Sequence, residues 1–309
     1  MRIFLTGASG YIGSAVLDAF VHAGHQVTGL VRTPEKAAEV AARGGSPHEG
    51  DLHDAESYRH AAEGHDVFVH AGFDYARGAD TDRAAIDALL AAARAGDARR
   101  PRLLIYTSGI WALGAAPMPV AEDAPLNPVA NVAFRPGHEQ LVLSSAGSGL
   151  RTVVVRPGIV FGGARGIVGE FFRDAVHGLI RVVGPGDNRW PAVYHRDLAD
   201  LYVKLAQHAE ASGVFHATDE SDERVNDIVA AIAAHAPKTP DIRRVPIKEA
   251  QAKMGPYALA LALDQVVRSP RARALGWMPA VRSIAGNAAR LFEEWRAAAH
   301  PRGQDAGRE

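Results

Sequence analysis

The sequence predicts an α/β protein: a doubly wound parallel sheet with a smaller C-terminal lobe. In the first half of the chain, short β-rich runs alternate with alanine-rich helical stretches, which is typical of parallel strands joined by crossover helices. A glycine-rich turn directly follows the first of these runs. The 309 residues exceed what one hydrophobic core commonly supports, so a main domain with an appended lobe is expected.

The elements of the first half follow one another as strand and helix. Strands are predicted at Arg2–Thr6, Gln26–Val31, Asp66–His70, Leu103–Ser108 and Thr152–Arg156. Helices are predicted at Tyr11–Ala23, near Ala55–Ala62 and at Asp80–Ala95. The first helix has apolar residues at helical spacing, and Gly24 follows it as a terminating glycine. This order predicts a single sheet with helices on both faces.

The second half shows fewer regular patterns. Pro117–Pro136 holds five prolines and is predicted to be a loop, and the glycine-rich Gly158–Trp190 is predicted to be irregular. Helices are expected at Asp197–Ala209, Arg224–Ala234 and Gly286–Ala298, with a strand at Gly213–Ala217 that returns to the sheet. The predicted main domain therefore comprises residues 1–161 with 191–218, the lobe 162–190 with 219–298, and 299–309 a disordered tail.

Composition excludes several classes of function. The chain has 34 basic and 35 acidic side chains, so there is no electrostatic case for a nucleic-acid or anionic-membrane partner. It has no cysteine, which excludes disulfides, thiolate catalysis and cysteine–zinc sites. No apolar run approaches the roughly 18–20 residues of a membrane span, and residues 1–7 do not resemble a signal peptide. A cytoplasmic location is the resulting expectation.

Histidines do not form a metal pattern. Among the 14 histidines there is no H-E-x-x-H motif and no His–carboxylate cluster at helical spacing. We therefore predict no metal.

The most informative segment is the glycine turn from Thr6 to Gly13, with the letters TGASGYIG. A first glycine permits a tight turn, a second lets a pyrophosphate approach the backbone, and a third lets the helix pack on the strand. The N-terminus of the helix then offers free N–H groups and a positive dipole end to phosphates. The turn predicts a Rossmann-like dinucleotide site made by Gly7, Ser9, Gly10, Tyr11, Ile12 and Gly13, the alternative being a plain strand–helix turn.

The spacing TGxxGxxG resembles the signature of the extended and atypical short-chain dehydrogenase/reductases, which are NAD-dependent epimerase/dehydratase-like proteins. Similar segments follow in the family's order: Gly50-Asp51-Leu52, His70-Ala71-Gly72, Thr107-Ser108-Gly109, Arg156 to Gly162 and Trp190 to Asp197. The resemblance covers about residues 1–290. It implies that Asp51 and Leu52 hold the adenine. It also implies cofactor contacts for His70, Ala71, Gly72, Thr107, Pro157, Gly158, Ile159 and Val160.

The end of the second strand bears on the choice of cofactor. NAD-specific proteins of this fold carry an acidic residue there for the ribose hydroxyls. Here the strand ends in Arg32, and Lys36 follows. A guanidinium suits a 2′-phosphate, so NADP(H) is expected over NAD(H), the alternative being that Arg32 is a solvated surface residue.

The family's catalytic Tyr-x-x-x-Lys pair is absent. When the segment is aligned on Glu139, the resemblance places Asn131 and Arg135 at the two positions. An asparagine amide can hydrogen-bond a carbonyl oxygen but cannot transfer a proton, and an arginine stays protonated. The expected roles are therefore orientation of the carbonyl oxygen by Ser108 and Asn131, and anchoring of the ribose and stabilisation of charge by Arg135.

The proton then has to come from another group. Histidine is the residue type suited to this near neutral pH, and one continuous helix would place His138 on the same face as Asn131 and Arg135. Further candidates are His70, Tyr106 and His195. However, Pro136 follows Arg135 directly and favours a first helical turn, so the helix can equally begin there, with Asn131 in the loop. His138 would then be an ordinary surface or core histidine.

Three functions are compatible with these observations. The first is an NADP(H)-dependent oxidoreductase acting on a small carbonyl or alcohol. The second is a sensor or regulator that binds NADP(H) without turnover, which the lost tyrosine favours. The third is an NAD-dependent epimerase or dehydratase of sugar nucleotides, which Arg32 and Asn131 disfavour. The resemblance also implies a homodimer through the helices near Asp80–Ala95 and Pro136–Ser148.

Overall fold

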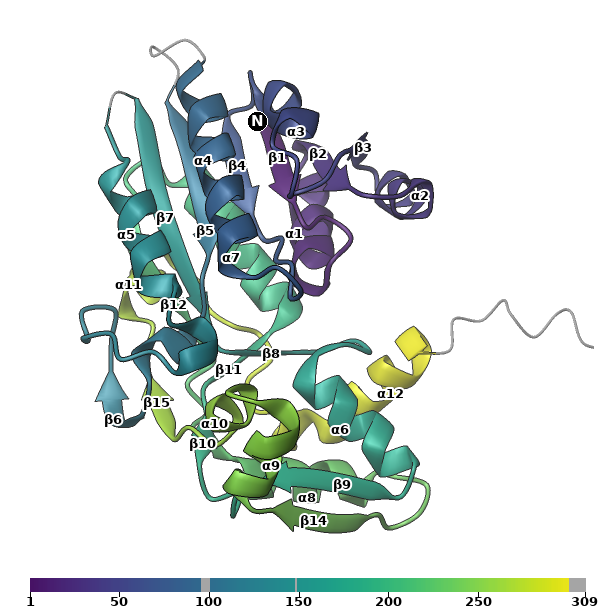
Figure 1. Ribbon diagram of the computed structural model, residues 1–309. Coiled ribbons are helices and arrows are strands. Elements are labelled where there is room, and N and C mark those ends of the chain that lie inside the picture. The colour runs from purple at the N-terminus through teal and green to yellow at the C-terminus, as the bar shows by residue number, and fades with distance from the viewer. Residues whose placement is uncertain (96–100, 148, 300–309) are drawn as a thin grey trace, which may run out of the picture.

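The central sheet has seven strands, all paired in parallel (Figure 1). The computed structural model describes residues 1–95, 101–147 and 149–299, so the predicted tail from residue 300 on and Ser148 lie outside the described residues. The strand order is β12-β7-β5-β4-β1-β2-β3. The bounds are β1 Arg2–Thr6, β2 Gln26–Val31, β3 Ser46–Glu49, β4 Val67–His70, β5 Arg102–Thr107, β7 Leu150–Pro157 and β12 Gly213–Ala217. The doubly wound sheet is confirmed.

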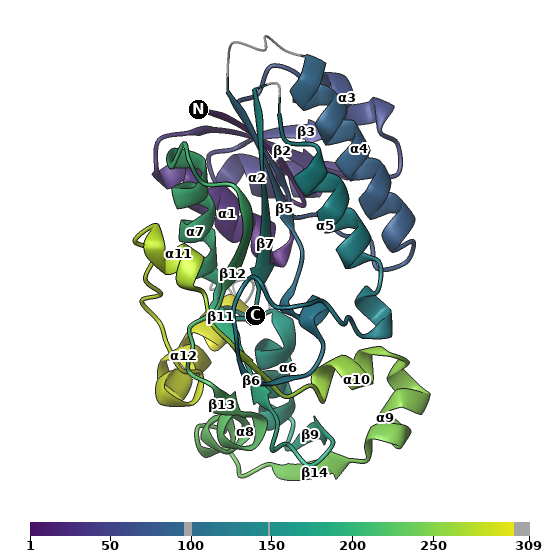
Figure 2. The same ribbon diagram turned by 90° about the vertical axis from the view of Figure 1, so that its left-hand side faces the viewer.

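Helices cover both faces of this sheet (Figure 2). One face carries α1 (Tyr11–His22), α2 (Pro34–Ala42) and α7 (His195–Gln207). The other carries α3 (Glu56–Ala62), α4 (Ala79–Ala95) and α5 (Arg135–Ser144). Because side chains alternate along a strand, Ile3 and Leu5 pack on the α1 side and Phe4 on the α4 side. Continuous apolar strands of this kind are typical of a parallel sheet buried on both faces.

The lobe lies beyond the carboxyl ends of the strands and has its own apolar core (Figure 1). The small parallel ladder of β9 with β14 belongs to the lobe, and the ladder of β8 with β11 lies where the lobe joins the sheet, with side chains in both cores. The strands are β8 Ile159–Phe161, β9 Leu179–Val183, β10 Arg189–Trp190, β11 Ala192–Tyr194, β13 Glu223–Arg224 and β14 Asp241–Val245. Its helices are α6 Gly166–Val176, α8 Val225–Ala234, α9 Ile247–Met254, α10 Tyr257–Leu261 and α12 Ala288–Ala299.

Smaller elements connect the two parts. Strand β6 pairs with β15, and α11 packs on β12. Their bounds are β6 Ala116–Val120, β15 Gln265–Val267 and α11 Pro270–Ala274, with short 3-10 helices η1 Ile110–Leu113, η2 Ala130–Val132 and η3 Ala285–Asn287. Trp277, which follows α11, is buried in the core of the sheet on the α1 side.

Two sequence predictions for the second half are wrong. Gly158–Trp190 is not irregular, since it contains β8, α6, β9 and β10. Its glycines lie in the turns, where Gly162, Gly163 and Gly166 take positive φ. Pro117–Pro136 is not a loop throughout, because β6 reaches Val120 as one strand of a two-stranded sheet, where proline is tolerated. No helix in the described part of the chain has the length and apolarity needed to cross a membrane.

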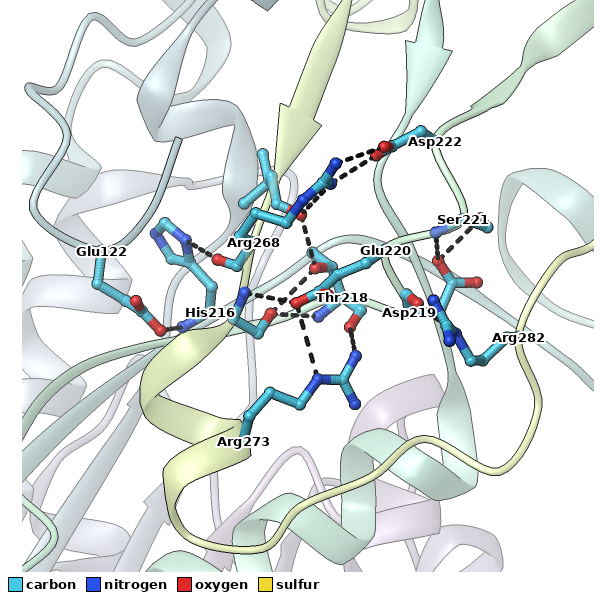
Figure 3. A network of polar contacts seen from close by, with 12 residues as sticks. Glu122, His216, Thr218, Asp219, Glu220, Ser221, Asp222, Arg268, Arg273 and Arg282 are labelled. Atoms are coloured by element: carbon cyan, nitrogen blue, oxygen red, sulfur yellow. Dashed lines mark hydrogen bonds and ion pairs between the residues drawn. The ribbon is translucent and has the colours of Figure 1, made fainter. Parts of the chain in front are cut away.

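A polar network fastens the turn after β12 to the rest of the lobe (Figure 3). Arg268 makes two hydrogen bonds to the Asp222 carboxylate, at 2.8 and 2.6 Å. Arg282 Nε donates to the backbone oxygen of Asp219 at 2.8 Å. Glu220 and Asp222 have φ of 59° and 54°, a left-handed conformation that these contacts stabilise. Burial raises the pKa of the Asp219 carboxyl to about 6, although the hydrogen bonds from Ser221 act to lower it.

The glycine turn is as tightly packed as its motif predicts. A Cβ on Gly13 would overlap the carbonyl oxygen of Gly7, and a Cβ on Gly7 would lie 2.6 Å from Gly72 Cα. Gly7 also has a φ of 71°. These contacts press α1 and the end of β4 against the turn, and only hydrogen fits at the two glycine positions.

We predict that Gly13→Ala destabilises the protein by at least about 1–3 kcal/mol, because the added methyl group has no space. Gly137→Ala is the matched control. Gly137 lies in the first turn of α5 with no atom within 4 Å of an added Cβ, so its replacement raises stability by about 0.5–1 kcal/mol. Urea unfolding measures both. A Gly13→Ala variant as stable as the wild type would contradict this packing.

Candidate functional site

The first turn of α1 forms a cradle for phosphate groups. Gly10 is the N-cap residue, and no side chain caps the helix there. The N–H groups of the first turn and the positive end of the helix dipole are therefore directed at whatever lies over Gly10. A Cβ at this position would already lie 3.0 Å from the Gly7 oxygen, so the glycine keeps the approach open. The residues present fit a dinucleotide.

The other segments expected along the cofactor lie next to this turn or lead away from it. A Cβ on Gly72 would lie 2.9 Å from Leu52 Cδ1 and 3.1 Å from the Gly7 nitrogen, so the ends of β1, β3 and β4 meet here. The Asp51 carboxylate accepts the N–H of His53 at 3.0 Å. The stretch from Pro157 to Val160 passes from β7 into β8, and Ile159 N donates to Pro191 O at 2.7 Å.

Arg32 directly follows β2, at the edge of the sheet where the parallel strands have their carboxyl ends. Its side chain is 66% exposed, and its guanidinium lies 3.6 Å from Asp74 Oδ2. Asp74 already accepts a hydrogen bond from His53 Nε2 at 2.8 Å. The Arg32 charge is therefore only loosely paired and remains open to a further anion.

Asp82 is the centre of a buried polar cluster between α4, α5 and the ends of β4 and β5. Tyr106 donates its hydroxyl proton to Asp82 Oδ2 at 2.6 Å, and His138 Nδ1 lies 2.7 Å from the same oxygen. His70 Nε2 lies 3.4 Å and Arg135 3.8 Å from Asp82 Oδ1. Burial alone would raise the pKa of Asp82, but the hydrogen bond from His138, the nearby His70 and the Arg135 charge hold it far below its usual range. The carboxylate is ionised, so His138 Nδ1 carries the proton between them.

Arg135 begins α5 and points back to the end of β5. It donates to the Tyr106 hydroxyl at 2.7 Å and to the Thr107 oxygen at 2.8 Å. Its guanidinium carbon lies 5.1 Å from the ring centre of Phe73 and 4.9 Å from that of Phe134. Phe73 and Phe134 are stacked with their centres 5.7 Å apart. The cation is thus fixed by the Tyr106 hydroxyl and the Thr107 oxygen, with aromatic rings beside it.

Asn131 lies in η2, apart from α5, so the helix begins at Arg135 and the continuous-helix alternative is wrong. The reason is Pro136, which occupies the first turn of α5 and cannot continue a helix from before it. The Asn131 Oδ1 atom is buried and has no hydrogen-bond partner among the described residues. A buried amide without a partner is costly, and a bound ligand would satisfy it.

Ser108 is part of a second buried cluster. Its hydroxyl donates to Glu139 Oε1 at 2.5 Å, and Arg156 holds the same carboxylate with Nη2 to Oε2 at 2.6 Å. Glu139 and Arg156 are 2% and 4% exposed, so this is a fully buried ion pair. The Ser108 proton is directed at Glu139, which differs from the expected role of orienting a carbonyl oxygen.

The remaining candidates lie in different surroundings. His70 Nδ1 lies 2.7 Å from Thr6 Oγ1, deep in the sheet. Tyr106 is fully buried, and burial raises its pKa above the normal range. His195 begins α7, where its Nε2 lies 3.2 Å from Glu294 of α12. In the described parts of the chain no three histidine, aspartate or glutamate side chains are arranged to hold a metal ion.

A cavity of about 280 Å³ opens in the lobe between α6, α9, α10 and the β9–β14 ladder. Its buried lining is apolar and includes Phe171, Trp190 and Leu261, whereas exposed charged residues such as Arg181 and Lys253 lie at its rim. Tyr257 lines the cavity and contacts Trp111 edge to face, with ring centres 5.7 Å apart. Trp111 belongs to η1, which directly follows Ser108 and Gly109. A residue that lines the cavity thus contacts the η1 segment, which follows Ser108 in the chain.

Asp82 was not identified from the sequence. The available signal was its position: Asp82 lies on the same helical face as Ala85, Ile86 and Leu89, all of which are fully buried. A carboxylate on an apolar helix face requires partners. Those partners lie 12 to 56 residues away in the chain, so no local pattern indicated them.

The fold and the glycine turn define a dinucleotide-binding protein of the Rossmann type. The model of the NAD dependent epimerase/dehydratase family matches residues 3–217. The chain belongs to this family, whose members include oxidoreductases and epimerases that act on small molecules.

Curated relatives include two reductases. A 4-hydroxy-2-methyl-3-oxo-4-farnesyl-3,4-dihydroquinoline-1-oxide ketoreductase of Stigmatella aurantiaca is 40% identical over 172 residues, 52% of this chain and 51% of the relative. A 2-alkyl-3-oxoalkanoate reductase of Stenotrophomonas maltophilia is 29% identical over 260 residues, 76% of each chain.

Solved structures share the fold at low sequence identity. A human epimerase family protein solved with NADPH has a TM-score of 0.78 at 19% identity, covering 95% of this chain and 99% of the other. A UDP-glucose 4-epimerase of Thermus thermophilus solved with NAD has a TM-score of 0.79 at 20% identity, covering 96% and 100%. Both of these structures were solved with a nicotinamide dinucleotide.

We predict that Glu139→Gln destabilises the protein by about 3–5 kcal/mol, because it leaves the Arg156 charge buried without a counter-charge. The double variant with Arg156→Met is expected to lose less than the sum of the two single losses. Asp87→Asn, which breaks the half-exposed Arg83–Asp87 pair, is the control and costs at most about 0.5 kcal/mol. Urea unfolding of the four variants tests this, and additive single losses would contradict a coupled pair.

Proposed function

We propose that this protein is an NADP(H)-dependent reductase of small carbonyl compounds, working without the usual tyrosine–lysine pair. The observation that carries the proposal is the Asp82 cluster, in which a histidine and an arginine share one ionised carboxylate and which His70 joins to Thr6 of the glycine turn. The unpaired Oδ1 of Asn131, in the segment just before α5, supports it. The two reductases among the relatives support the reaction class. The same chemistry run in reverse would oxidise an alcohol.

The dinucleotide would be held by the glycine turn at its phosphates, by Asp51 and Leu52 at its adenine, and by Arg32 at a 2′-phosphate. When bound, NADPH supplies the hydride. In this proposal the nicotinamide end of the cofactor is contacted by four segments: residues 70–72, Thr107, Arg135 and residues 157–160. Support comes from the contact of β4 with the glycine turn and from the loosely paired charge of Arg32.

His138 is the proposed proton donor. Its Nδ1 is hydrogen-bonded to the ionised Asp82, so Nε2 is the atom that gives up a proton. The negative charge of Asp82 stabilises the imidazolium that exists before the transfer. Tyr106 is a poor alternative, because burial raises its pKa and its proton already goes to Asp82. His70 is a poorer alternative, because its Nδ1 is paired with Thr6 and its buried Nε2 lies 3.4 Å from Asp82 Oδ1.

The other polar groups position the substrate. The Asn131 Nδ2–H group donates to the carbonyl oxygen, while its unpaired Oδ1 accepts a hydrogen bond from a donor on the ligand. Arg135 anchors the ribose and stabilises the negative charge that develops on that oxygen. Ser108 acts as a positioning residue, since its proton is directed at Glu139 and fixes the start of the η1 segment.

The substrate class we propose is a carbonyl compound with an apolar chain. The lobe cavity of about 280 Å³ has roughly twice the volume that holds a benzene ring, and its floor is aromatic and aliphatic. The alkyl and farnesyl groups in the names of the two reductase relatives fit such a floor. A cytoplasmic location and a homodimer through α4 and α5, which lie side by side on one face of the sheet (Figure 2), belong to the same proposal.

We predict that NADPH binds more tightly than NADH, and that Arg32→Ala weakens NADPH binding about 10-fold or more without changing NADH binding, since a charge-assisted hydrogen bond is worth about 1.5–3 kcal/mol. Arg43→Ala, which removes an exposed arginine paired with Asp18, is the control and leaves both affinities unchanged. Cofactor fluorescence titration measures them. Purified protein carrying tightly bound NAD, with no preference for NADPH, would favour the epimerase alternative.

We predict that the protein oxidises NADPH with 3-oxo acids, and that His138→Gln lowers kcat by a factor of about 10²–10⁴, the usual contribution of a general acid. His208→Gln, at an exposed position after α7, is the control. Stopped-flow absorbance follows both reactions. Tight NADPH binding with no turnover on 3-oxo acids or on a broad panel of aldehydes and ketones would instead support the non-catalytic sensor.

A further inference from the structure

A short loop of the lobe lies directly on the glycine turn. This loop, residues 162–166, connects β8 to α6. Tyr11 of the turn donates its hydroxyl proton to the Gly162 oxygen at 2.7 Å. Arg165 donates from Nη1 to the Ser9 oxygen at 3.2 Å. The loop therefore contacts the turn on both sides of Gly10, the residue that keeps the phosphate cradle open.

The loop is held in this position from its other side. Glu294 of α12 accepts the N–H of Gly163 at 2.9 Å and the hydroxyl of Tyr194 at 3.0 Å. Gly162, Gly163 and Gly166 have φ of 108°, 64° and 75°, values that glycine adopts readily and other residues rarely adopt. A Cβ on Gly166 would lie 2.8 Å from Tyr11 Cε1. The glycines thus let the loop backbone lie close against the glycine turn, which fixes the position of the Arg165 backbone.

Arg165 is a cation without a carboxylate partner. In residues 1–95, 101–147 and 149–299, no ion pair joins it to an acidic side chain, and its recorded hydrogen bond goes to a neutral backbone oxygen. An arginine has five N–H donors in a planar fork, so most of its donors remain available. Its side chain is exposed although its backbone is fixed. A charge placed at the rim of a phosphate cradle, and not neutralised there, is suited to an anion.

We propose that Arg165 binds a phosphate group of the dinucleotide, as a clamp contributed by the lobe. This inference rests on the cofactor of the proposed function. The diphosphate lies over the first turn of a Rossmann helix, which is the turn that Arg165 reaches at Ser9. Arginine binds phosphate with two parallel hydrogen bonds, which adds orientation to charge. The clamp couples the lobe to the main domain, so cofactor release requires the loop to lose this contact.

The test is a titration of the purified full-length chain with NADPH and with NADH, for the wild type, Arg165→Ala and Arg165→Lys. Arg173→Ala is the matched control, because Arg173 is an exposed arginine later in the same helix and its loss changes the net charge equally. We expect Arg165→Ala to weaken binding about 10- to 100-fold. The lysine variant should recover part of this, and the control should match the wild type.

The two cofactors identify the phosphate. Equal weakening of NADPH and NADH binding assigns Arg165 to the diphosphate, which we expect because Ser9 belongs to the glycine turn. Weakening of NADPH alone assigns it to the 2′-phosphate beside Arg32. Unchanged affinity for both, in a variant with the wild-type melting temperature, overturns the clamp and leaves the proposed function standing. A wild-type protein that binds neither dinucleotide refutes the proposed function itself.

Tyr11→Phe tests whether the loop position matters. The phenyl ring keeps its packing, but the bond to the Gly162 oxygen is lost. If that bond seats the clamp, Tyr11→Phe weakens cofactor binding in the wild type and has a smaller effect in the Arg165→Ala background. Equal effects in the two backgrounds would show that Tyr11 acts independently, and the loop would then not be the means by which Arg165 is positioned.

Discussion

The buried carboxylate of Asp82 is the interaction on which the candidate site depends. It contacts side chains from β4, β5 and α5, and three of these, His70, His138 and Arg135, can carry positive charge. A single buried cation would be costly, and a cluster of them would not form. Asp82 offsets that charge with one group, so the ends of two strands and the start of a helix can meet at one point.

A second buried carboxylate organises the neighbouring layer in the same way. Glu139 follows His138 directly, yet it contacts a different set of residues, Arg156 and Ser108. The reason is that successive helix residues point about 100° apart. One turn of α5 therefore serves two clusters. Ser108 takes part in the Glu139 cluster and Arg135 in the Asp82 cluster, so the two residues expected to share a substrate have separate anchors.

The lobe takes part in the site rather than only bordering it. Its cavity shares a wall with the η1 segment through Trp111 and Tyr257, and its loop 162–166 rests on the glycine turn. Both contacts join segments that lie far apart in the sequence. In the proposed function the main domain binds the cofactor, and the lobe supplies groups that select the substrate.

The sequence by itself determined the sheet and the cofactor turn, because these depend on local patterns. Short apolar runs encode strands β1 and β2, and the need for backbone freedom encodes the glycines of the turn. Both signals can be read within about ten residues. The sequence predicted the lobe helices α8 and α12 but not α6, which glycine turns obscured, and it did not indicate the contacts of Asp82 and Arg165. Only the tertiary structure decided these, because a buried charge and a cation at the rim of a cradle are defined by partners from distant segments. Electrostatic contacts of that kind leave no periodic pattern in the chain.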